Sequence, residues 1–309
     1  MTEVLSIHNL DIKEKTVCTV GNFDGIHIGH KALLDKVKSE SLKLKAKSVV
    51  ITFFPHPRKI LSPQNYKCSI VNFETKIYLL KEENIDYILV ADFNERFYKK
   101  SPKEFMDFLK EKLNCRKIIV GKDWRFGYKK EGDITFATEY GKQIGIEIEA
   151  FDNICLDRER VSSSKIRELL LEGNIKEAKK YLGRDYFLKE KVVKGDGLGK
   201  KLGFPTINLK PNDDLCLKMG VYAGFLEFGD KRYPVVVNYG NRPTVDGKKV
   251  FIEAHIIEHF DKEVKENSLV NIYFIERLRE EKKFESVEEL KKQIEIDIKK
   301  AREVLSYVY

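Results

Sequence analysis

The sequence predicts two domains of different class, an α/β domain with a doubly wound parallel sheet and then a mainly β domain that ends in a C-terminal helix. Its 309 residues exceed the size at which single cores usually stop growing, about 250 to 300 residues. In the first half, short apolar strands alternate with amphipathic helices. After about Gly183, strands follow one another with short turns that contain Gly, Asn or Asp.

The predicted strands of the first half are short runs rich in apolar and β-branched residues. They are Thr16–Val20, Val49–Phe54, Tyr87–Val90, Lys117–Val120 and Glu147–Phe151. One intervening helix begins at Ser101, where Pro102 and Glu104 complete a capping-box pattern. Because ligands bind beyond the carboxyl ends of parallel strands, we expect the functional residues in the loops that follow these strands.

The second half is predicted to form an antiparallel barrel. Its strands are Phe187–Val193, Val221–Phe228, Arg232–Val237, Val250–Ile257 and Leu269–Phe274. A closing helix over 286–305 begins with a capping-box pattern at Ser286 and Glu289, and we expect it to pack on the barrel. Its apolar face is Leu290, Ile294, Ile298, Ala301 and Leu305. We place the boundary near Gly183–Asp185, which gives domains 1–184 and 185–309.

Composition excludes a disordered chain, since hydrophobic residues make up 42% and charged residues 34%. Apolar runs are too short to span a bilayer, and the N-terminus lacks a basic segment followed by an apolar one, so we expect a cytoplasmic protein. The net charge of +8 suits nucleic acid or phosphate-bearing ligands equally, although solvated helix faces explain many of the charges. Cysteines 18, 68, 115, 155 and 216 lack zinc or redox spacing, which favours structural roles for all five.

The first candidate site follows the strand Thr16–Val20. The string GNFDGIHIGH, Gly21–His30, runs into an amphipathic helix, so glycine backbone and the helix N-terminus can approach a phosphate. His27 and His30 add donors that suit charge developing on an α-phosphate and on departing pyrophosphate. Taken alone, the string also fits an ordinary loop with incidental histidines. We assign nucleotide or other ligand binding to Gly21, Asn22, Phe23, Asp24 and Gly29.

Three later loops add candidates. His56 lies between two stiffening prolines in TFFPHPR. Asp123 and Arg125 lie in VGKDWRFGYKKEGD, where Trp124 and Phe126 fit either local packing or contact with a ligand. In RVSSSKIRELLLEGNI we expect Ser163 and Ser164 to cap a helix whose N-terminus and Arg167 face a triphosphate. A surface His and a plain serine cap beside an exposed Arg are the alternatives when each motif is taken alone.

The second candidate site contains the loop and strand GDGLGKKLGFPTINL, Gly195–Leu209, which lacks the Gly-Lys-Ser/Thr ending of a P-loop. On that strand Thr206 and Asn208 share one face, and we expect Ile207 to point into the core. Glu253 lies among apolar residues in FIEAHI. A carboxylate there can orient an alcohol and accept its proton during phosphoryl transfer, although most strand glutamates face solvent.

Taken together, the motifs resemble known families. GNFDGIHIGH resembles the His-Ile-Gly-His string of the nucleotidyltransferase superfamily, and with TFFPHPR, VGKDWRFGYKKEGD and RVSSSKIRELLLEGNI it resembles the FAD synthetase module of prokaryotic bifunctional riboflavin kinase/FAD synthetases. PTIN at 205–208, VVNYGNRPTVDG at 236–247, FIEAHI at 251–256 and the closing segment resemble riboflavin kinase. The resemblance covers nearly the whole chain.

This resemblance implies a Rossmann-like nucleotidyltransferase domain followed by a six-stranded riboflavin kinase barrel. Riboflavin is phosphorylated by ATP to FMN, and FMN is adenylylated by a second ATP to FAD. The resemblance makes Glu253 the kinase base and Thr206 and Asn208 the Mg²⁺ ligands. It gives nucleotide or flavin contacts to Gly195, Gly203 and Arg302, although a surface Arg is the alternative for Arg302. His27, His30 and Arg167 serve adenylyl transfer.

The sequence departs from the family patterns at three places. Ile207 replaces Ala, Ser164 stands where Thr is frequent, and Asp123 stands where some relatives have Asn, which weakens its assignment. Two rival hypotheses are an adenylyltransferase for another small phosphate, such as phosphopantetheine, and a flavin or nucleotide sensor that binds RNA. We expect riboflavin, FMN and ATP as partners, no nucleic acid or membrane, and a monomer or weak homo-oligomer.

Overall fold

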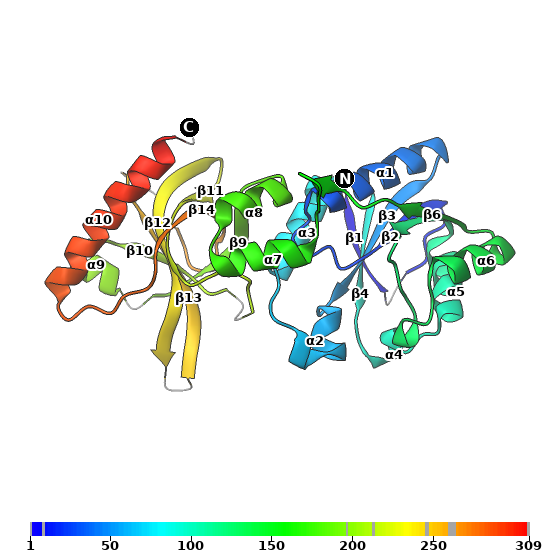
Figure 1. Cartoon of the computed structure of the whole chain (residues 1–309), viewed down its shortest axis with the longest axis horizontal. Helices are drawn as coiled ribbons and strands as arrows, with labels where there is room; N and C mark the ends of the chain where they lie inside the picture. Colours follow the sequence, from blue (N-terminus) through cyan, green and yellow to red (C-terminus); the bar gives the residue numbers. More distant parts are fainter. Residues whose placement is uncertain are drawn as a thin grey trace. The chain divides into compact units, whose positions relative to one another are not determined.

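The computed structural model describes residues 2–7, 10–195, 197–211, 214–244, 247–258 and 264–307 (Figure 1). Two compact units divide the chain: unit 1 is Met1–Lys67 with Lys76–Ser162, and unit 2 is Cys68–Thr75 with Ser163–Tyr309. The segment from 163 to 184 therefore groups with the barrel rather than with the parallel sheet. The division into functional domains 1–184 and 185–309 remains a prediction.

Unit 1 contains a six-stranded parallel sheet in the order β1-β4-β3-β2-β5-β6. The strands are β1 (Glu3–Ser6), β2 (Thr16–Val20), β3 (Lys47–Phe54), β4 (Tyr87–Asp92), β5 (Cys115–Gly121) and β6 (Glu147–Phe151). The five predicted strands are confirmed. The edge strand β1 was not predicted, because it is short and largely exposed and lacks an apolar run.

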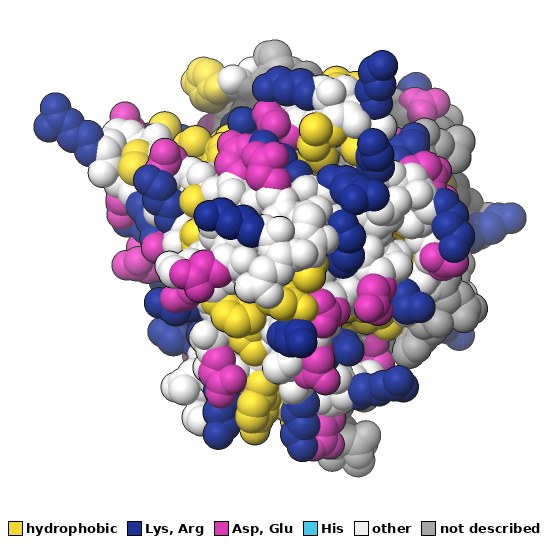
Figure 2. Space-filling view, turned by 90° about the vertical axis from the view of Figure 1, so that its right-hand side faces the viewer, with side chains coloured by type: hydrophobic (Ala, Val, Ile, Leu, Met, Phe, Trp, Pro, Cys, Tyr) yellow, Lys and Arg dark blue, Asp and Glu magenta, His cyan; other side chains and the backbone are white. Residues whose placement is uncertain are grey.

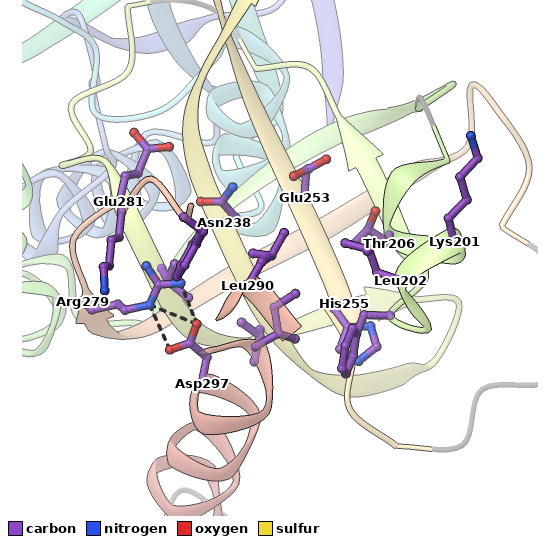
Figure 3. Close-up of a pocket in the computed structure, with 17 residues that line it drawn as sticks. Lys201, Leu202, Thr206, Asn238, Glu253, His255, Arg279, Glu281, Leu290 and Asp297 are labelled. Atoms are coloured by element: carbon purple, nitrogen blue, oxygen red, sulfur yellow. Dashed lines mark hydrogen bonds and ion pairs between the residues drawn. The ribbon is translucent and has the colours of Figure 1, made fainter. Parts of the chain in front are cut away.

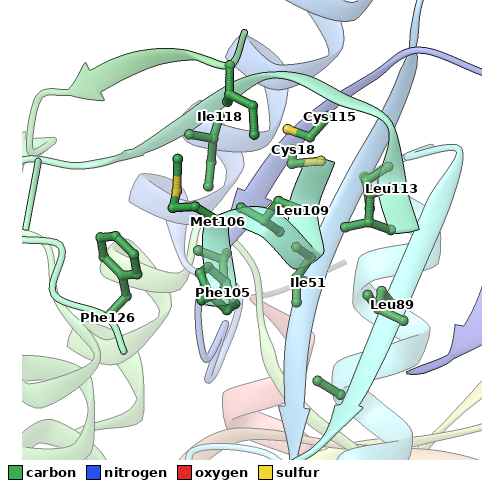
Figure 4. Close-up of a cluster of buried hydrophobic side chains, with 14 of the residues drawn as sticks. Cys18, Ile51, Leu89, Phe105, Met106, Leu109, Leu113, Cys115, Ile118 and Phe126 are labelled. Carbon is green, nitrogen blue, oxygen red and sulfur yellow. The ribbon is translucent and has the colours of Figure 1, made fainter. Parts of the chain in front are cut away.

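Helices cover both faces of this sheet, as the alternation of strand side chains requires. They are α1 (Ile28–Lys43), α2 (Pro57–Leu61), α3 (Phe73–Glu82), α4 (Glu95–Tyr98), α5 (Pro102–Leu113) and α6 (Ile134–Ile144), and the first three residues of α3 belong to unit 2. On one face Val17 and Ile119 pack with Val37 of α1. On the other, Cys18 and Ile118 join a larger cluster with α5 (Figure 4). The doubly wound arrangement is confirmed.

Unit 2 is a closed barrel in the order β10-β13-β12-β11-β14-β9, with antiparallel pairing throughout. Its strands are β9 (Tyr186–Val193), β10 (Thr206–Leu209), β11 (Gly220–Phe228), β12 (Lys231–Thr244), β13 (Gly247–Ile256) and β14 (Leu269–Arg279). The barrel prediction is confirmed. β12 and β13 are longer than predicted and form one continuous hairpin ladder, while residues 245 and 246 of the VVNYGNRPTVDG motif lie outside the described residues.

The helices of unit 2 are α7 (Ser163–Glu172), α8 (Ile175–Leu182), α9 (Leu198–Leu202) and α10 (Val287–Ser306), besides the start of α3. Helix α10 packs on the barrel, as predicted, and buries Ala301 and Leu305 (Figure 1). Ser286 caps it by accepting from the Glu289 N–H at 3.2 Å, but the Glu289 carboxylate accepts from the Glu285 N–H at 3.3 Å instead of closing the predicted box.

One short segment of the first half, 68–75, belongs to unit 2. Cys68 forms a disulfide with Cys216, and the Tyr186 hydroxyl donates to the Ile70 carbonyl at 2.7 Å. The Asn72 side-chain amide donates to the Glu190 carboxylate at 2.8 Å. The separation of 148 residues hides this disulfide from inspection of cysteine spacing. The segment is therefore an integral part of unit 2.

The surface agrees with the interpretation of the charges as solvated. On the face drawn in Figure 2, Lys and Arg side chains are interspersed with Asp and Glu rather than gathered into one patch. Within the described part of the chain, every helix is too short or too polar to cross a lipid bilayer.

Candidate active sites

In unit 1 the phosphate-binding candidates lie where β2 meets α1. His27 is the N-cap of α1, and its Nδ1 accepts a hydrogen bond from the His30 N–H at 3.2 Å. The two rings stack with centroids 3.6 Å apart and planes 13° apart. Because Nδ1 is the acceptor, a neutral His27 carries its proton on Nε2 and can donate it to an anion. The predicted pair of histidine donors is therefore brought together at a helix N-terminus.

The loop that precedes these histidines is fixed by buried side chains. Phe23 and Ile26 are almost fully buried and have positive φ angles of 47° and 35°, while the intervening Asp24 is also buried. The Phe23 ring lies 5.0 Å from the His30 ring, and a Cβ added at Gly21 would meet it at 3.1 Å. Non-glycine residues at positive φ persist where surrounding contacts hold them. The backbone of the loop is therefore set before a ligand arrives.

His56 reaches the same place from the neighbouring strand. It caps α2, because its Nδ1 accepts from the Arg58 N–H at 3.1 Å, and its Nε2 contacts the Asn22 side-chain amide. A side-chain contact that the sequence analysis did not predict thus joins the ends of β2 and β3. Pro57 sets the first helical position, where proline is favoured.

A cavity of about 510 Å³ adjoins this loop, since Gly21 and Asn22 line it. Trp124 and Phe126 stack with ring centroids 4.0 Å apart, and both line the cavity, so they serve packing and lining together. Further aromatic rings come from segments far apart in the sequence, and only the structure shows that they converge. These are Phe53, Phe93, Phe97, Tyr98, Phe105 and Tyr128.

Of the two candidates in the loop after β5, one lines the cavity and the other does not. Arg125 lines the cavity and pairs with Asp133 at 3.0 Å, whereas Asp123 is exposed, pairs with Arg160 at 2.6 Å and is not a lining residue.

Three further candidates, Ser163, Ser164 and Arg167, lie in unit 2, so the structure does not group them with the loop of unit 1. Helix α7 already begins at Ser163, so the cap position falls on Ser162, and the prediction that Ser163 and Ser164 cap the helix is wrong. The Arg167 Nε donates to the Cys68 carbonyl at 3.2 Å.

In unit 2 a cavity of about 670 Å³ is lined by Thr206 and Glu253, together with Asn238 and His255 (Figure 3). Strand pairing fixes their relation, because Thr206 is opposite His255, and Glu253 is opposite both Asn208 and Asn238 on its two neighbouring strands. Directly opposed residues have Cβ atoms about 4.5 to 5.5 Å apart on the same side of a sheet. The register places Thr206, Asn208 and Glu253 on one side of the sheet, although Asn208 is not a lining residue of the cavity.

The glycine-rich loop closes tightly on the strand that carries Thr206 and Asn208. A Cβ added at Gly195 would lie 2.2 Å from the Asn208 amide nitrogen, and one at Gly199 would lie 2.4 Å from the Phe204 carbonyl. Asn208 is buried and its amide donates to the Thr206 carbonyl at 3.3 Å. Only glycine allows this approach. Ile207 shares its side of β10 with the buried Leu209 and lies opposite the buried Ala254, in the predicted direction, although Ile207 itself is only half-buried.

These residues fit a magnesium ion in their donor chemistry. Thr206 offers a hydroxyl and Asn208 an amide oxygen, the hard oxygen ligands that Mg²⁺ accepts alongside phosphate oxygens. The Asn208 amide lies 3.5 Å from the Thr206 hydroxyl, so both side chains project to the same place. Among the described residues, no group of three or more His, Cys, Asp or Glu side chains is placed to hold a metal by itself.

Sequence reasoning missed a charged side of the unit 2 cavity. Asp297 of α10 accepts a forked hydrogen bond from Arg279 of β14, and both line the cavity (Figure 3). Burial raises the pKa of Glu281, although the hydrogen bond from the Asn241 N–H and the charge of Arg279 oppose this shift. The Glu281 carboxylate occupies the space that a Cβ at Gly240 would fill.

The sequence did hold a signal for the buried Asp297: this acidic residue lies near Ile294 and Ile298 of the apolar face of the closing helix. Gly203, at φ +91°, ends α9. Arg302 donates to the Ile257 carbonyl at 2.9 Å and is not a lining residue.

Comparisons with known proteins match the two halves of the chain to two different families. A family model described as FAD synthetase matches residues 9–165, and one described as riboflavin kinase matches residues 182–305. Bifunctional riboflavin kinase/FMN adenylyltransferases from Escherichia coli K12 and Buchnera aphidicola of Schizaphis graminum are 33% and 34% identical, covering 98% and 96% of this chain and 97% of each relative.

A crystal structure of a Streptococcus pneumoniae protein described as macrolide-efflux protein superposes with a TM-score of 0.82 at 28% identity, over 97% of this chain and 98% of that one. The resemblance first indicated by the motifs thus extends over the full length of curated relatives. The chain belongs to the family of bifunctional riboflavin kinase/FMN adenylyltransferases.

Proposed function

We propose that the unit 2 cavity is the place where riboflavin is phosphorylated to FMN, and that the unit 1 cavity is the place where FMN is adenylylated to FAD. Membership in the family supports both reactions, each with ATP as the second substrate. The assignment of individual residues rests on the contacts described above.

In the kinase reaction, the Glu253 carboxylate orients the terminal hydroxyl of the ribityl chain and accepts its proton as the oxygen attacks the γ-phosphorus of ATP. The bond from that phosphorus to the β,γ-bridging oxygen breaks, and ADP leaves. The strand register that places Glu253 opposite Asn208 is the observation that carries this assignment. We assign Gly195 and Gly203 to nucleotide binding, because a glycine backbone can approach a phosphate closely. We also assign Arg302 to this substrate site.

Thr206 and Asn208 would hold Mg²⁺ against the ATP phosphates, where the ion supplies neutralisation of phosphate charge. Removal of divalent cations should stop FMN formation. Thr206→Ala should raise the Mg²⁺ concentration needed for half-maximal FMN formation about tenfold or more and leave the adenylylation of supplied FMN unchanged. An unchanged magnesium dependence in this variant would remove Thr206 from the ligand set.

In the adenylylation reaction, an oxygen of the FMN phosphate attacks the α-phosphorus of the second ATP, and pyrophosphate leaves. His27 and His30 donate hydrogen bonds to the phosphate groups as charge develops, with the N-terminus of α1 and the backbone of Gly21–His30. Asn22, Phe23, Asp24, Gly29 and His56 shape this loop, and we assign Ser163, Ser164 and Arg167 to the triphosphate. Asp123 and Arg125 remain our candidates for substrate contact.

The aromatic cavity of unit 1 suits the isoalloxazine ring of FMN. Planar aromatic ligands gain from offset stacking and edge contacts with aromatic side chains, and Trp124 and Phe126 both line this cavity. Gly21 and Asn22 also line this cavity, so a flavin ring held there lies beside the loop Gly21–His30, called the phosphate loop below. This adjacency supports FMN over phosphopantetheine as the phosphate-bearing substrate.

The decisive experiment incubates the purified protein with riboflavin, ATP and Mg²⁺ and separates the flavins by chromatography over time. FMN that appears before FAD supports both steps and their order. The double variant His27→Ala/His30→Ala should form FMN at the wild-type rate and no FAD. Flavin binding without turnover would instead support the sensor hypothesis.

We further propose that the protein works in the cytoplasm as a monomer or weak homo-oligomer, without nucleic-acid or membrane partners. The functional domains would be 1–184 and 185–309. Light scattering during turnover tests the oligomeric state, and a nucleic-acid binding assay at physiological salt tests the expected absence of that partner.

A further inference from the structure

A lysine that the reaction scheme does not use lies buried beneath the phosphate loop. Lys76 belongs to the part of α3 in unit 1, and only 8% of its surface is exposed. Lysine is almost never this deeply buried unless its ammonium group is paired. On sequence alone it is an ordinary charged residue of an amphipathic helix.

Three polar contacts of Lys76 lie near the carboxyl ends of two adjacent strands. Its Nζ donates to the Phe53 carbonyl at 3.0 Å, and it lies 3.4 Å from the Thr52 hydroxyl and 3.5 Å from the Asn22 carbonyl. The Thr52 hydroxyl in turn donates to the Asn22 carbonyl at 3.2 Å. The ammonium group therefore connects the end of β3 with the first turn of the phosphate loop.

The positive charge of Lys76 is disfavoured by burial and favoured by a nearby carboxylate. Burial lowers the pKa of Lys76 to about 8, and the Asp24 carboxylate opposes that effect. Asp24 lies in the loop itself, between Phe23 and Gly25, both of which have positive φ angles. The buried ammonium group of Lys76 contacts two backbone carbonyls and is attracted by the Asp24 carboxylate. Such contacts can hold the loop Gly21–His30 in a backbone conformation that is unfavourable by itself.

We propose that Lys76 is a positioning residue for adenylyl transfer: it fixes Asn22 and, through Asn22, the Gly21–His30 loop and His56 in the geometry that receives the ATP phosphates. The inference rests on the proposed location of the triphosphate at this loop. Lys76 acts through backbone and does not contact substrate, because its side chain is buried against these strand ends. Asn22 is the link, since its carbonyl faces Lys76 while its amide contacts His56.

The test compares Lys76→Met, which keeps the length of the side chain but removes the charge, with Lys81→Met, the same change at an exposed position of the same helix. Both reactions are measured on each preparation: FMN formation from riboflavin reports the amount of folded unit 2, and the KM for FMN together with circular dichroism reports whether unit 1 is folded. We expect Lys76→Met to lower kcat for FAD formation from supplied FMN about 100-fold, as a displaced reacting group does, with KM for FMN changed less than about threefold. Lys81→Met should match the wild type in both reactions.

Lys76→Arg and a pH profile separate positioning from a merely structural role. In the wild type, kcat for FAD formation should fall above about pH 8, as the buried amine loses its proton, and FMN formation should not show this step. Lys76→Arg should recover part of the lost kcat and move the fall to higher pH, because guanidinium stays protonated.

Three results would overturn the inference: FAD formation by folded Lys76→Met within threefold of wild type, equal loss of both reactions in Lys76→Met and Lys76→Arg, or an alkaline fall shared by both reactions. The variant His27→Ala/His30→Ala distinguishes these failures from a failure of the proposed site. If that variant still makes FAD, the site assignment is wrong. If it makes none while Lys76→Met is fully active, only the role of Lys76 is wrong.

Discussion

Arg279 and Asp297 form a forked ion pair between strand β14 and helix α10, with Arg279 Nε 3.0 Å and Nη2 2.7 Å from Asp297 Oδ2. Asp297 is only 2% exposed, and Gln293 donates to its other oxygen at 2.9 Å. The pair fastens the C-terminal helix over the cavity that also contains Glu253. Its integrity is therefore expected to matter for stability and for the kinase reaction.

Asp297→Ala should lower the free energy of unfolding of unit 2 by about 3 to 5 kcal/mol, because breaking a buried pair leaves Arg279 without its counter-charge. Denaturant titration followed by circular dichroism measures the change. Glu303→Gln, on the exposed side of the same helix, is the control. In a double-variant cycle, the loss of unfolding free energy in Asp297→Ala/Arg279→Leu should be smaller than the summed losses of the two single variants. Strict additivity would mean that the two side chains do not interact.

Glu253→Gln should reduce FMN formation by about 100-fold or more, since general-base contributions are typically 10² to 10⁴. The amide keeps the size of the side chain but cannot accept the proton. Adenylylation of supplied FMN should stay at the wild-type rate, as it should in Glu258→Gln, an exposed control just beyond the same strand. A Glu253→Gln variant that still phosphorylates riboflavin at the normal rate would exclude Glu253 as the base.

Gly195→Ala should impair the kinase through its neighbour. The added methyl group would lie 2.2 Å from the Asn208 amide nitrogen, so either the loop or the proposed magnesium ligand must move. We expect a higher KM for ATP and a higher magnesium requirement in FMN formation, with FAD formation from FMN unaffected. Unchanged values of both parameters would show that the loop can move away without cost.

Glu190 should make the stability of unit 2 fall as pH rises from about 4.5 to about 8. Burial raises the pKa of this carboxyl from 4.5 to about 8, although the Asn72 hydrogen bond opposes the shift. Across that window the folded state keeps a proton that the unfolded chain releases, so the free energy of unfolding decreases with pH. Glu190→Gln, which cannot ionise, should lose this dependence, whereas the exposed control Glu266→Gln should retain it. Parallel melting curves for wild type and Glu190→Gln between pH 5 and 8 would refute the assignment.

Reduction of the disulfide between Cys68 and Cys216 should destabilise unit 2. In the chain-entropy description, closing a loop of this length stabilises a protein by about 5 kcal/mol. Five cysteines less the two in the disulfide leave three thiols, so a thiol reagent should label three sites in unreduced, denatured protein. Cys68→Ser/Cys216→Ser should melt at one temperature with and without reductant. Labelling of all five sites would mean that the bond does not form.

The sequence predicted the parts of the molecule that depend on local pattern. Alternating strands and helices identified the parallel sheet, and Ser101 with Glu104 identified the start of α5, where the full capping box is present. The glycine-histidine loop was found because its residue types suit phosphate at the start of a helix. The cap of α7 was misplaced by one residue, because three consecutive serines offer the same side chain at each candidate position.

Features that depend on tertiary burial could not be predicted in this way. The aromatic cavity of unit 1 draws rings from several segments, and none of these segments carries a distinctive motif. Lys76 and Asp297 look like solvated charges in the sequence, and only packing shows that both are buried. The partner of Cys68 lies 148 residues away, beyond any spacing rule.

The assignment of the segment Cys68–Thr75 to unit 2 has a consequence for dissecting the protein. The chain passes between the two units three times, after Lys67, Thr75 and Ser162, so no single cut separates them. A fragment that begins at residue 185 would lack Asn72, the hydrogen-bond partner of Glu190, and would leave Cys216 without its sulfur partner. A fragment that begins at residue 185 is therefore expected to unfold more readily than unit 2 of the full chain, and an isolated unit 2 would have to include the segment Cys68–Thr75.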